Sequence, residues 1–283
     1  MADGALKGQT AVVTGGAGAI GGAIAAALAK DGAAVVIMGR KAESLEKMKA
    51  KILAQTPGAR IECSPGDGMK PEDFIKAADM AVKIANRLDI VVATVGGGGF
   101  KPLLMQDVDG FRAELDYNII SSFIAIRYGA TRMKNGGSIV CISSTAAGMP
   151  FPWLSAYCTA KGGLEHLVRT AADELSSLKI RVNAIRPGLT KSDSAAGMFE
   201  NPDVLAHFLQ QVPAGRGGEP EDIAQGVRYL AGPESSWTTG VSFAVDGGHE
   251  LRRNPDLTEM VRHMYGAETL AKLQRGDWPD FPK

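Results

Sequence analysis

The chain has 283 residues, of which 45% are hydrophobic and 22% charged, an ordinary balance for a globular protein with one sizeable core. The 31 basic residues are matched by 31 acidic ones, so charge gives no reason to expect nucleic acid or an anionic membrane as a partner. Three scattered cysteines, a start without signal-peptide features and the lack of an apolar run of about 18 residues predict a cytoplasmic protein with no disulfide framework, zinc site or membrane span.

Short β-branched runs alternate with longer helical patterns along the chain. Strands are predicted at residues 10–14, 33–38, 60–64, 88–95, 137–143, 179–185 and 240–248. Helices are predicted at residues 17–32, 41–55, 71–87, 107–134 with a break near Gly110, and 155–178, with a further helix after residue 218. This alternation, with strands that read as continuous apolar runs, predicts an α/β fold: a doubly wound, seven-stranded, mainly parallel sheet with helices on both faces.

Two segments fall outside this alternation. Residues 188–218, which we call the lid, are rich in Gly, Pro and Ser around a short helical stretch, and long insertions of this kind often cover a ligand site. Residues 249–283, the tail, are expected to pack on residues 1–248 or on a neighbouring subunit. A tail helix with Asn254 as its cap and Pro255 in its first turn is predicted from four apolar residues at helical spacing: Leu257, Met260, Val261 and Met264.

The segment TGGAGAIGG, residues 14–22, lies between the first predicted strand and the first predicted helix. Glycines allow the backbone to approach a ligand closely, and a helix amino terminus presents unpaired N–H groups to an anion. This is the context that a dinucleotide requires. The predicted contacts to the cofactor are Gly15, Gly16, Ala17, Ala19, Ile20 and Gly21.

The second strand ends in MGRKAE, where Gly39 is followed by Arg40 and Lys41. An acidic residue at this point would bind the ribose hydroxyls of NAD and repel a 2′-phosphate, whereas the planar fork of arginine can bind two phosphate oxygens. The sequence therefore predicts NADP(H) as the preferred cofactor and leaves NAD(H) open. The alternative interpretation is a solvent-exposed basic pair on the next helix.

The stretch AYCTAKGG places Tyr157 and Lys161 four residues apart, about one helical turn. A free tyrosine has a pKa of about 10, and a neighbouring ammonium group would lower that pKa toward the operating pH. Ser144, at the end of the fifth strand, is positioned to donate a hydrogen bond to a substrate carbonyl. Ser143 is the alternative, although the spacing to Tyr157 favours Ser144. Taken alone, a tyrosine–lysine pair also occurs by chance on helices.

Together these motifs resemble the short-chain dehydrogenase/reductase family. The segment from Thr14 to Gly21 is similar to its TGxxxGxG motif, with Ala19 in place of the middle glycine. RVNAIRPGLTKS (181–192) resembles its PG motif, and residues 215–248 resemble its carboxyl-terminal core. The likeness covers about residues 6 to 248 and implies a single Rossmann-type domain. Four residues match the catalytic tetrad of the family: Asn118, Ser144, Tyr157 and Lys161.

The resemblance implies a role for each member of the tetrad. Tyr157 would donate or accept the proton, and Ser144 would orient the carbonyl group. Lys161 would bind the nicotinamide ribose and lower the pKa of the tyrosine, and Asn118 would hold a water molecule in a proton relay.

Further cofactor contacts are implied by the same likeness. Asp67 would bind the adenine amino group and Gly68 would add a backbone contact; the alternative for Asp67 is an ordinary turn aspartate. Ala93 and Thr94 stand where the family has two asparagines that brace the sheet, and Thr94 is expected to replace this brace in part. The remaining implied contacts are Val95, Gly96, Gly97, Pro187, Gly188, Leu189 and Thr190, together with Asn118, Tyr157 and Lys161.

The sequence thus predicts an NADP(H)-dependent oxidoreductase that interconverts a secondary alcohol and a ketone. Its alternatives are an NAD(H)-dependent enzyme of the same family and an NADP(H)-binding sensor or scaffold without turnover. A hydrophobic or bulky small-molecule substrate is favoured by apolar residues that could equally pack lid to body: Phe151, Pro152, Trp153, Leu154, Met198, Phe199, Leu205, Phe208 and Leu209. The resemblance also implies a homotetramer or homodimer that pairs through the helix bearing Ile119, Phe123 and Ile126. The four histidines, His166, His207, His249 and His263, lack metal-ligand spacing, so no metal is expected and they are interpreted as surface or core residues.

Overall fold

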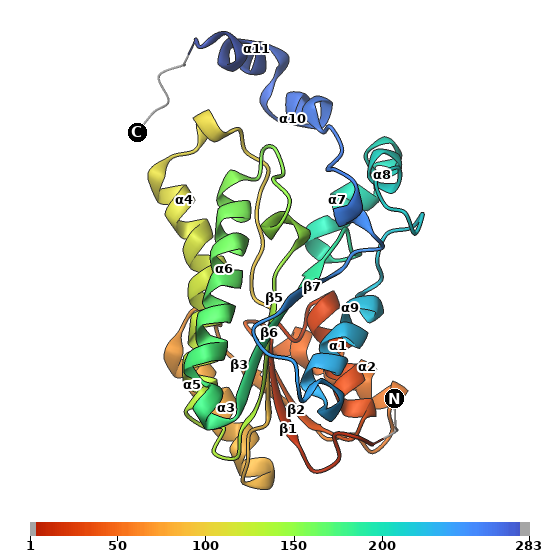
Figure 1. Cartoon of the computed structure of the whole chain (residues 1–283). Helices are drawn as coiled ribbons and strands as arrows, with labels where there is room; N and C mark the ends of the chain where they lie inside the picture. Colours follow the sequence, from red (N-terminus) through yellow and green to blue (C-terminus); the bar gives the residue numbers. More distant parts are fainter. Residues whose placement is uncertain (1–3, 278–283) are drawn as a thin grey trace.

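The structure, a computed structural model, describes residues 4–277, in which one central sheet is covered by helices (Figure 1). All strand pairings are parallel, in the order β3-β2-β1-β4-β5-β6-β7. This confirms the predicted α/β fold with its seven-stranded sheet. The strands are β1 (Thr10–Thr14), β2 (Ala34–Gly39), β3 (Ile61–Pro65), β4 (Ile90–Ala93), β5 (Gly137–Ile142), β6 (Ile180–Pro187) and β7 (Ser242–Val245).

Helices cover both faces of the sheet (Figure 1). One face is covered by α1 (Ala19–Lys30), α2 (Ala42–Gln55) and α9 (Pro220–Ala231). The other is covered by α3 (Pro71–Ala85), α5 (Ser121–Ala130) and α6 (Ser155–Glu174), and α4 (Val108–Leu115) precedes α5. The lid contributes α7 (Ala196–Phe199) and α8 (Pro202–Leu209), and the tail contributes α10 (Thr258–Tyr265) and α11 (Ala267–Arg275). Among residues 4–277, no helix is both long and apolar enough to cross a membrane.

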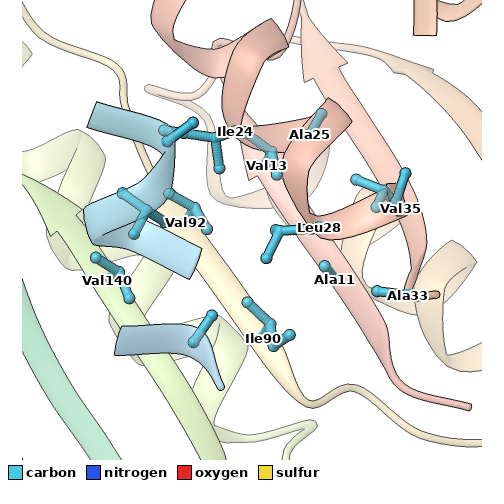
Figure 2. Close-up of a cluster of buried hydrophobic side chains, with 14 of the residues drawn as sticks. Ala11, Val13, Ile24, Ala25, Leu28, Ala33, Val35, Ile90, Val92 and Val140 are labelled. Atoms are coloured by element: carbon cyan, nitrogen blue, oxygen red, sulfur yellow. The ribbon is translucent and has the colours of Figure 1, made fainter. Parts of the chain in front are cut away.

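The strands are apolar on both sides because both sides are buried. Side chains alternate along β1, so Val12 packs under α3 and α5 whereas Val13 packs under α1. Figure 2 shows the second of these layers, in which Ile24 and Leu28, one turn apart on α1, face Val13 and Val92. Each such side chain contributes about 1.5–3 kcal/mol when it is fully buried. This packing fixes the carboxyl ends of the strands along one edge of the sheet.

The predicted helix at 107–134 is interrupted, but not near Gly110 as the sequence suggested. The N–H of Gly110 donates a hydrogen bond of 2.6 Å to Asp107 Oδ1, so Gly110 lies in the capped first turn of α4. The irregularity is a π-helical turn, Asp116–Ile120, between α4 and α5. Such turns insert one extra residue and often occur at functional sites. Ile126, predicted to face a neighbouring subunit, is 5% exposed and packs in the core, so that prediction was wrong, whereas Phe123 is exposed.

The tail packs on the lid. Leu257 and Met260 contact the core of the lid, and we call the resulting group the lid–tail cluster; its members are Phe100, Phe151, Leu189, Met198, Val204, Phe208, Leu257 and Met260. The predicted cap at Asn254 was wrong, because α10 begins at Thr258, whose N–H is bound by the carboxylate of Asp256 at 2.9 Å. Asn254 instead donates to the carbonyl of Pro150 at 3.0 Å. Residues 278–283 of the predicted tail lie outside the described residues.

Thr94 braces the centre of the sheet, as expected from its place in the altered asparagine motif. Its N–H donates to Thr14 Oγ1 at 3.0 Å, and its hydroxyl donates to the carbonyl oxygen of Thr14. These two contacts join the end of β1 to the segment that follows β4.

Replacing Thr94 with valine should therefore destabilise the fold. Thr94→Val leaves the carbonyl of Thr14 without its side-chain donor, which we expect to lower the free energy of unfolding by about 1–3 kcal/mol. Thr94→Ser keeps the hydroxyl and should retain most of this stability. Urea unfolding followed by circular dichroism measures the difference, and equal stability of the two variants would contradict the brace.

Candidate active site

Two adjoining cavities lie at the carboxyl ends of the strands, where ligands bind in open parallel sheets. The larger, about 650 Å³, runs from the β1–α1 turn to the end of β2, and we call it the long cleft. The smaller, about 260 Å³, is bounded by β5, α6, the lid and the tail, and we call it the inner pocket. Both are lined by Ile20, Thr94, Gly96 and Ile142, so one continuous space joins them.

Nearly all predicted site residues line this space. Those in the long cleft are Gly15, Ala17, Ala19, Ile20, Gly21, Gly39, Arg40, Lys41, Asp67, Gly68, Val95 and Gly96. Those in the inner pocket are Gly97, Ser144, Tyr157, Lys161, Pro187, Gly188, Leu189 and Thr190. Gly16 and Asn118 are buried behind the walls instead.

The β1–α1 turn forms an anion cradle that only small residues permit. Gly15 has a φ of +60°, and a Cβ there would lie 2.4 Å from Thr94 Oγ1. A Cβ at Gly21 would lie 2.3 Å from the carbonyl oxygen of Gly15. The first turn of α1 has no side-chain cap, so its N–H groups remain available to a phosphate. Ala19 lines the cleft in place of the family's glycine. The turn therefore fits the pyrophosphate of a dinucleotide.

Arg40 and Lys41 form the basic end of the long cleft. Both side chains are exposed and line the cavity beyond Gly39, and neither forms an ion pair within residues 4–277. Their guanidinium and ammonium groups are thus available to an anionic ligand. Asp67 lines the same cavity, and its Oδ1 accepts a hydrogen bond from Met69 N–H at 3.0 Å, so it also has the turn role considered above.

Tyr157 faces the inner pocket from the first turn of α6. Burial raises the pKa of Tyr157 above its usual range, and the hydrogen bond with Ser144 opposes this rise. The nearby carboxyl group of Glu114 raises the tyrosine pKa further. Glu114 itself is desolvated, which raises its own pKa, and its Oε1 has no hydrogen-bond partner among the described residues.

Lys161 lies one turn beyond Tyr157, as predicted, but it acts differently on the phenol. Its Nζ is 5.6 Å from the centre of the Tyr157 ring and donates a hydrogen bond of 2.9 Å to the carbonyl of Ile142. Burial lowers the pKa of Lys161 to about 8. The expected lowering of the pKa of Tyr157 by Lys161 is not met in this structure, where burial raises the pKa of the phenol.

Ser143 and Ser144 both line the pocket but have separate partners. Ser143 donates to Glu165 Oε1 at 2.8 Å, and Glu165 also accepts from Arg186 Nε at 2.6 Å. Although burial opposes it, these donors and Ser242 lower the pKa of Glu165, so this carboxylate stays charged. Ser143 is thus committed to a structural network, and Ser144 is the serine that contacts Tyr157, in agreement with the spacing argument.

Asn118 lies in the π-turn and is fully buried. Its Oδ1 accepts from Gly97 N–H at 3.0 Å, and its Nδ2 donates to the carbonyls of Gly97 and Glu114, both at 2.8 Å. A Cβ at Gly96 would lie 2.7 Å from Asn118 Oδ1 and 2.9 Å from Lys161 Nζ. The side chain of Asn118 therefore holds residues 96–99, which we call the glycine loop, against the site.

The sequence analysis gave no site role to several residues that line the two cavities. Ser44, Met69, Ser192, Asp193 and Ser194 line the long cleft, and His249 and Asn254 line the inner pocket. Ser44 lies in α2 and Met69 lies between β3 and α3, where no motif marks them. The other residues are brought in by the lid and the tail, which lie outside the strand–helix alternation. Among residues 4–277, no group of three or more His, Cys, Asp or Glu side chains is placed to hold a metal ion.

Comparisons with known proteins agree with this geometry. The family model described as enoyl-(acyl carrier protein) reductase matches residues 15–250. The chain is 34% identical over 245 residues to the 7alpha-hydroxysteroid dehydrogenase of Escherichia coli K12, covering 86% of this chain and 94% of that protein. A short-chain type dehydrogenase/reductase from Mycobacterium ulcerans has a similar structure, with a TM-score of 0.89, 34% identity and coverage of 94% and 98%. A 7 alpha-hydroxysteroid dehydrogenase complexed with NADH and 7-oxo glycochenodeoxycholic acid gives a TM-score of 0.83, 31% identity and coverage of 90% and 100%.

The buried ammonium group of Lys161 should make stability depend on pH. Its pKa is about 8 in the folded chain and about 10.4 when unfolded, so between these values the unfolded chain binds more protons at this site. Stability contributed by Lys161 therefore rises with pH across this window. We expect the free energy of unfolding of wild type, minus that of Lys161→Met, to increase by roughly 1–3 kcal/mol from pH 8 to pH 10.5. Urea titrations at each pH measure this difference, and a constant difference would show that Lys161 is not desolvated.

Proposed function

We propose that this chain, which belongs to the short-chain dehydrogenase/reductase family, interconverts a secondary alcohol and a ketone with NADP(H) as its preferred cofactor. As a member of this family, it is an NAD(P)-dependent oxidoreductase of hydroxyl and carbonyl groups. One observation carries the proposal. The phenol of Tyr157 and the hydroxyl of Ser144 face the inner pocket, and this pocket opens into the long cleft with its anion cradle. A proton donor and a dinucleotide site thus share one space.

The residues of the inner pocket divide the work on the substrate oxygen. Ser144 donates a hydrogen bond to the carbonyl oxygen and orients it, and Tyr157 delivers a proton from its Oη to the same atom. A bound nicotinamide supplies the hydride in reduction and accepts it in oxidation. In the oxidative direction, Tyr157 receives the proton of the hydroxyl group. A preorganised donor pair of this kind stabilises the charge that develops on oxygen.

Lys161 keeps a positive charge beside this reaction. With a pKa of about 8 it is largely protonated at neutral pH, and its hydrogen bond to Ile142 places the charge beneath the glycine loop. We assign Lys161 to the nicotinamide ribose and to the stabilisation of phenolate on Tyr157 during proton transfer. Asn118 contributes by holding Gly97 in place, since all of its amide atoms are hydrogen-bonded.

The preference for NADP(H) is supported by charge at the end of β2. The strand ends at Gly39, and the two following side chains are the exposed cations Arg40 and Lys41 in the wall of the long cleft. A 2′-phosphate just beyond Gly39 would meet these two cations. The alternative is that Arg40 and Lys41 do not discriminate between NADPH and NADH. It is kept open because one structural neighbour is complexed with NADH.

The walls of the inner pocket favour an apolar substrate. Phe100, Phe151 and Phe208 line it, with edge-to-face contacts from Phe151 to the other two rings at 5.7 and 5.8 Å. Met198 and Leu189 add to this surface. A hydrocarbon ring or chain attached to the reacting carbon would bury itself against these groups. The relative that acts on a hydroxysteroid is an example of an enzyme with a bulky substrate of this type.

The proton-transfer role of Tyr157 is tested by removing a single oxygen atom. Tyr157→Phe should lower kcat by at least 10³-fold, because it removes the hydroxyl group that we assign as proton donor beside Ser144, while the Kd for NADPH changes less than about threefold. Tyr128→Phe, on α5 and away from both cavities, is the matched control. Absorbance of NADPH with a panel of hydrophobic ketones measures turnover. Normal turnover by Tyr157→Phe would overturn the assignment, and no turnover by wild type would favour the sensor or scaffold.

The phosphate role of Arg40 is tested by comparing the two cofactors. Arg40→Ala should weaken NADPH about 10- to 100-fold, as expected from the loss of charge-assisted hydrogen bonds, with little change for NADH. Lys51→Ala removes an exposed cation from the outer part of α2 and serves as the control. Titration calorimetry gives both dissociation constants. An equal loss for NADPH and NADH would show that Arg40 does not bind the 2′-phosphate.

A further inference from the structure

His249 is a buried polar side chain in the wall of the inner pocket. It follows β7 and begins a short 3-10 turn, His249–Leu251, and it is 2% exposed. Neither Nδ1 nor Nε2 forms a hydrogen bond of good geometry within residues 4–277, although the backbone of Arg253 lies close enough to raise the pKa of the ring. A buried polar group without a partner is costly, and native structures contain few of them. The imidazole therefore requires an explanation that simple core packing does not give.

The surroundings of His249 hold the ring in one position. The carboxylate of Asp246 accepts hydrogen bonds from Gly248 N–H at 2.8 Å and from Glu250 N–H at 2.7 Å, which fixes the turn on both sides of His249. The ring of Phe208 packs against the imidazole edge-to-face, with centroids 6.2 Å apart. Phe208 also lines the inner pocket. The imidazole is thus a fixed polar group beside an aromatic part of the pocket wall.

The protonation state of His249 sets which ligand group would match it. Burial lowers the pKa of His249, although the backbone of Arg253 and the carboxylates of Asp246 and Glu250 oppose this shift. A neutral imidazole offers one N–H donor and one nitrogen acceptor. A hydroxyl group can satisfy either nitrogen, since it both donates and accepts. A neutral hydroxyl group is therefore a better match than a carboxylate or an ammonium group.

We propose that His249 is a specificity-determining residue that binds a second polar group of the substrate, a hydroxyl group remote from the reacting carbonyl. The proposal rests on the proposed function, because it places this hydroxyl on a molecule whose carbonyl group lies at Ser144 and Tyr157. The three aromatic rings of the pocket then contact the hydrocarbon between the two polar groups. The substrate class is a hydroxy ketone, or the corresponding diol, with an apolar skeleton.

The test uses a ladder of paired substrates. Plain 2-alkanones of five to nine carbons are compared with 2-alkanones of the same length that bear a terminal hydroxyl group. This series varies the distance between the carbonyl group and the hydroxyl group. For wild type, the ratio of kcat/KM for the hydroxy ketone to that for the plain ketone should peak at one length, at least 10-fold above the shortest pair. His249→Phe should abolish this peak, and His249→Gln, which keeps a donor and an acceptor, should restore part of it.

The exposed His207 on α8 provides the control, because His207→Phe should leave the peak in place. The ratio within each variant is the readout, so a general loss of activity does not decide the outcome. A ratio that is the same in wild type and His249→Phe at every chain length overturns the proposal.

A buried histidine that is retained for binding should lower the stability of the fold, so we expect the Tm of His249→Phe to equal or exceed that of wild type. A fall in Tm of more than a few degrees would instead indicate a packing role.

A binding measurement separates this proposal from the proposed function. In protein labelled with ¹⁵N-histidine, the imidazole signals missing from His249→Phe belong to His249. Addition of the hydroxy ketones should shift these signals, and addition of the plain ketones should not. A selective shift without any turnover would support the His249 site and refute the ketone reductase activity. Turnover without a shift would retain the activity and refute the site.

Discussion

The ammonium group of Lys161 donates a hydrogen bond to the carbonyl of Ile142, the last residue of β5, and this contact fixes α6 to the end of the sheet. Residues four positions apart lie about one turn apart on the same side of a helix. Fixing Lys161 therefore also fixes Tyr157, one turn before it, and Glu165, one turn after it. Tyr157 is thereby directed at Ser144, and Glu165 at Ser143 and Arg186. The burial of Lys161 that accompanies this contact also desolvates its ammonium group and lowers its pKa. The same burial therefore sets both the position of α6 and the pKa of Lys161.

The two ends of the continuous cavity differ in polarity, and the polarity of each end follows from the element that forms it. At the β2 end, a strand that stops at Gly39 exposes two cations at the start of α2. At the other end, the lid–tail cluster provides the pocket with aromatic and sulfur-containing walls. The glycine loop between them is held by Asn118, whose place in a π-turn turns its amide toward Gly97. The cavity is therefore basic at its β2 end and largely aromatic where the lid covers it, and Tyr157 and Ser144 lie in the inner pocket.

Much of the fold and of the reaction centre was predictable, because both depend on local periodicity. Buried parallel strands give continuous apolar runs, and the turns after β1 and along α6 give motifs of fixed spacing. The π-turn was missed because no helix-breaking residue such as Gly110 marks it in the sequence, and the hydrogen bonds that Asn118 forms there join it to Gly97 of a distant loop. The pKa of Tyr157 was mispredicted because spacing reveals the neighbouring charge but not the burial. His249 gave no signal, since its importance arises from unpaired nitrogens in a wall formed by other segments.

Phe208 belongs to two structures at once, since it forms part of the pocket wall and of the lid–tail cluster, where Leu257 and Met260 pack behind it. A change in volume at either of these tail positions must displace the ring from the rear, although neither residue touches the cavity. Variation in the last helices of the chain can thus reshape the molecules that the enzyme accepts, while Ser144 and Tyr157 stay fixed to a sheet that such changes do not reach. Selectivity and chemistry can diverge independently in this architecture.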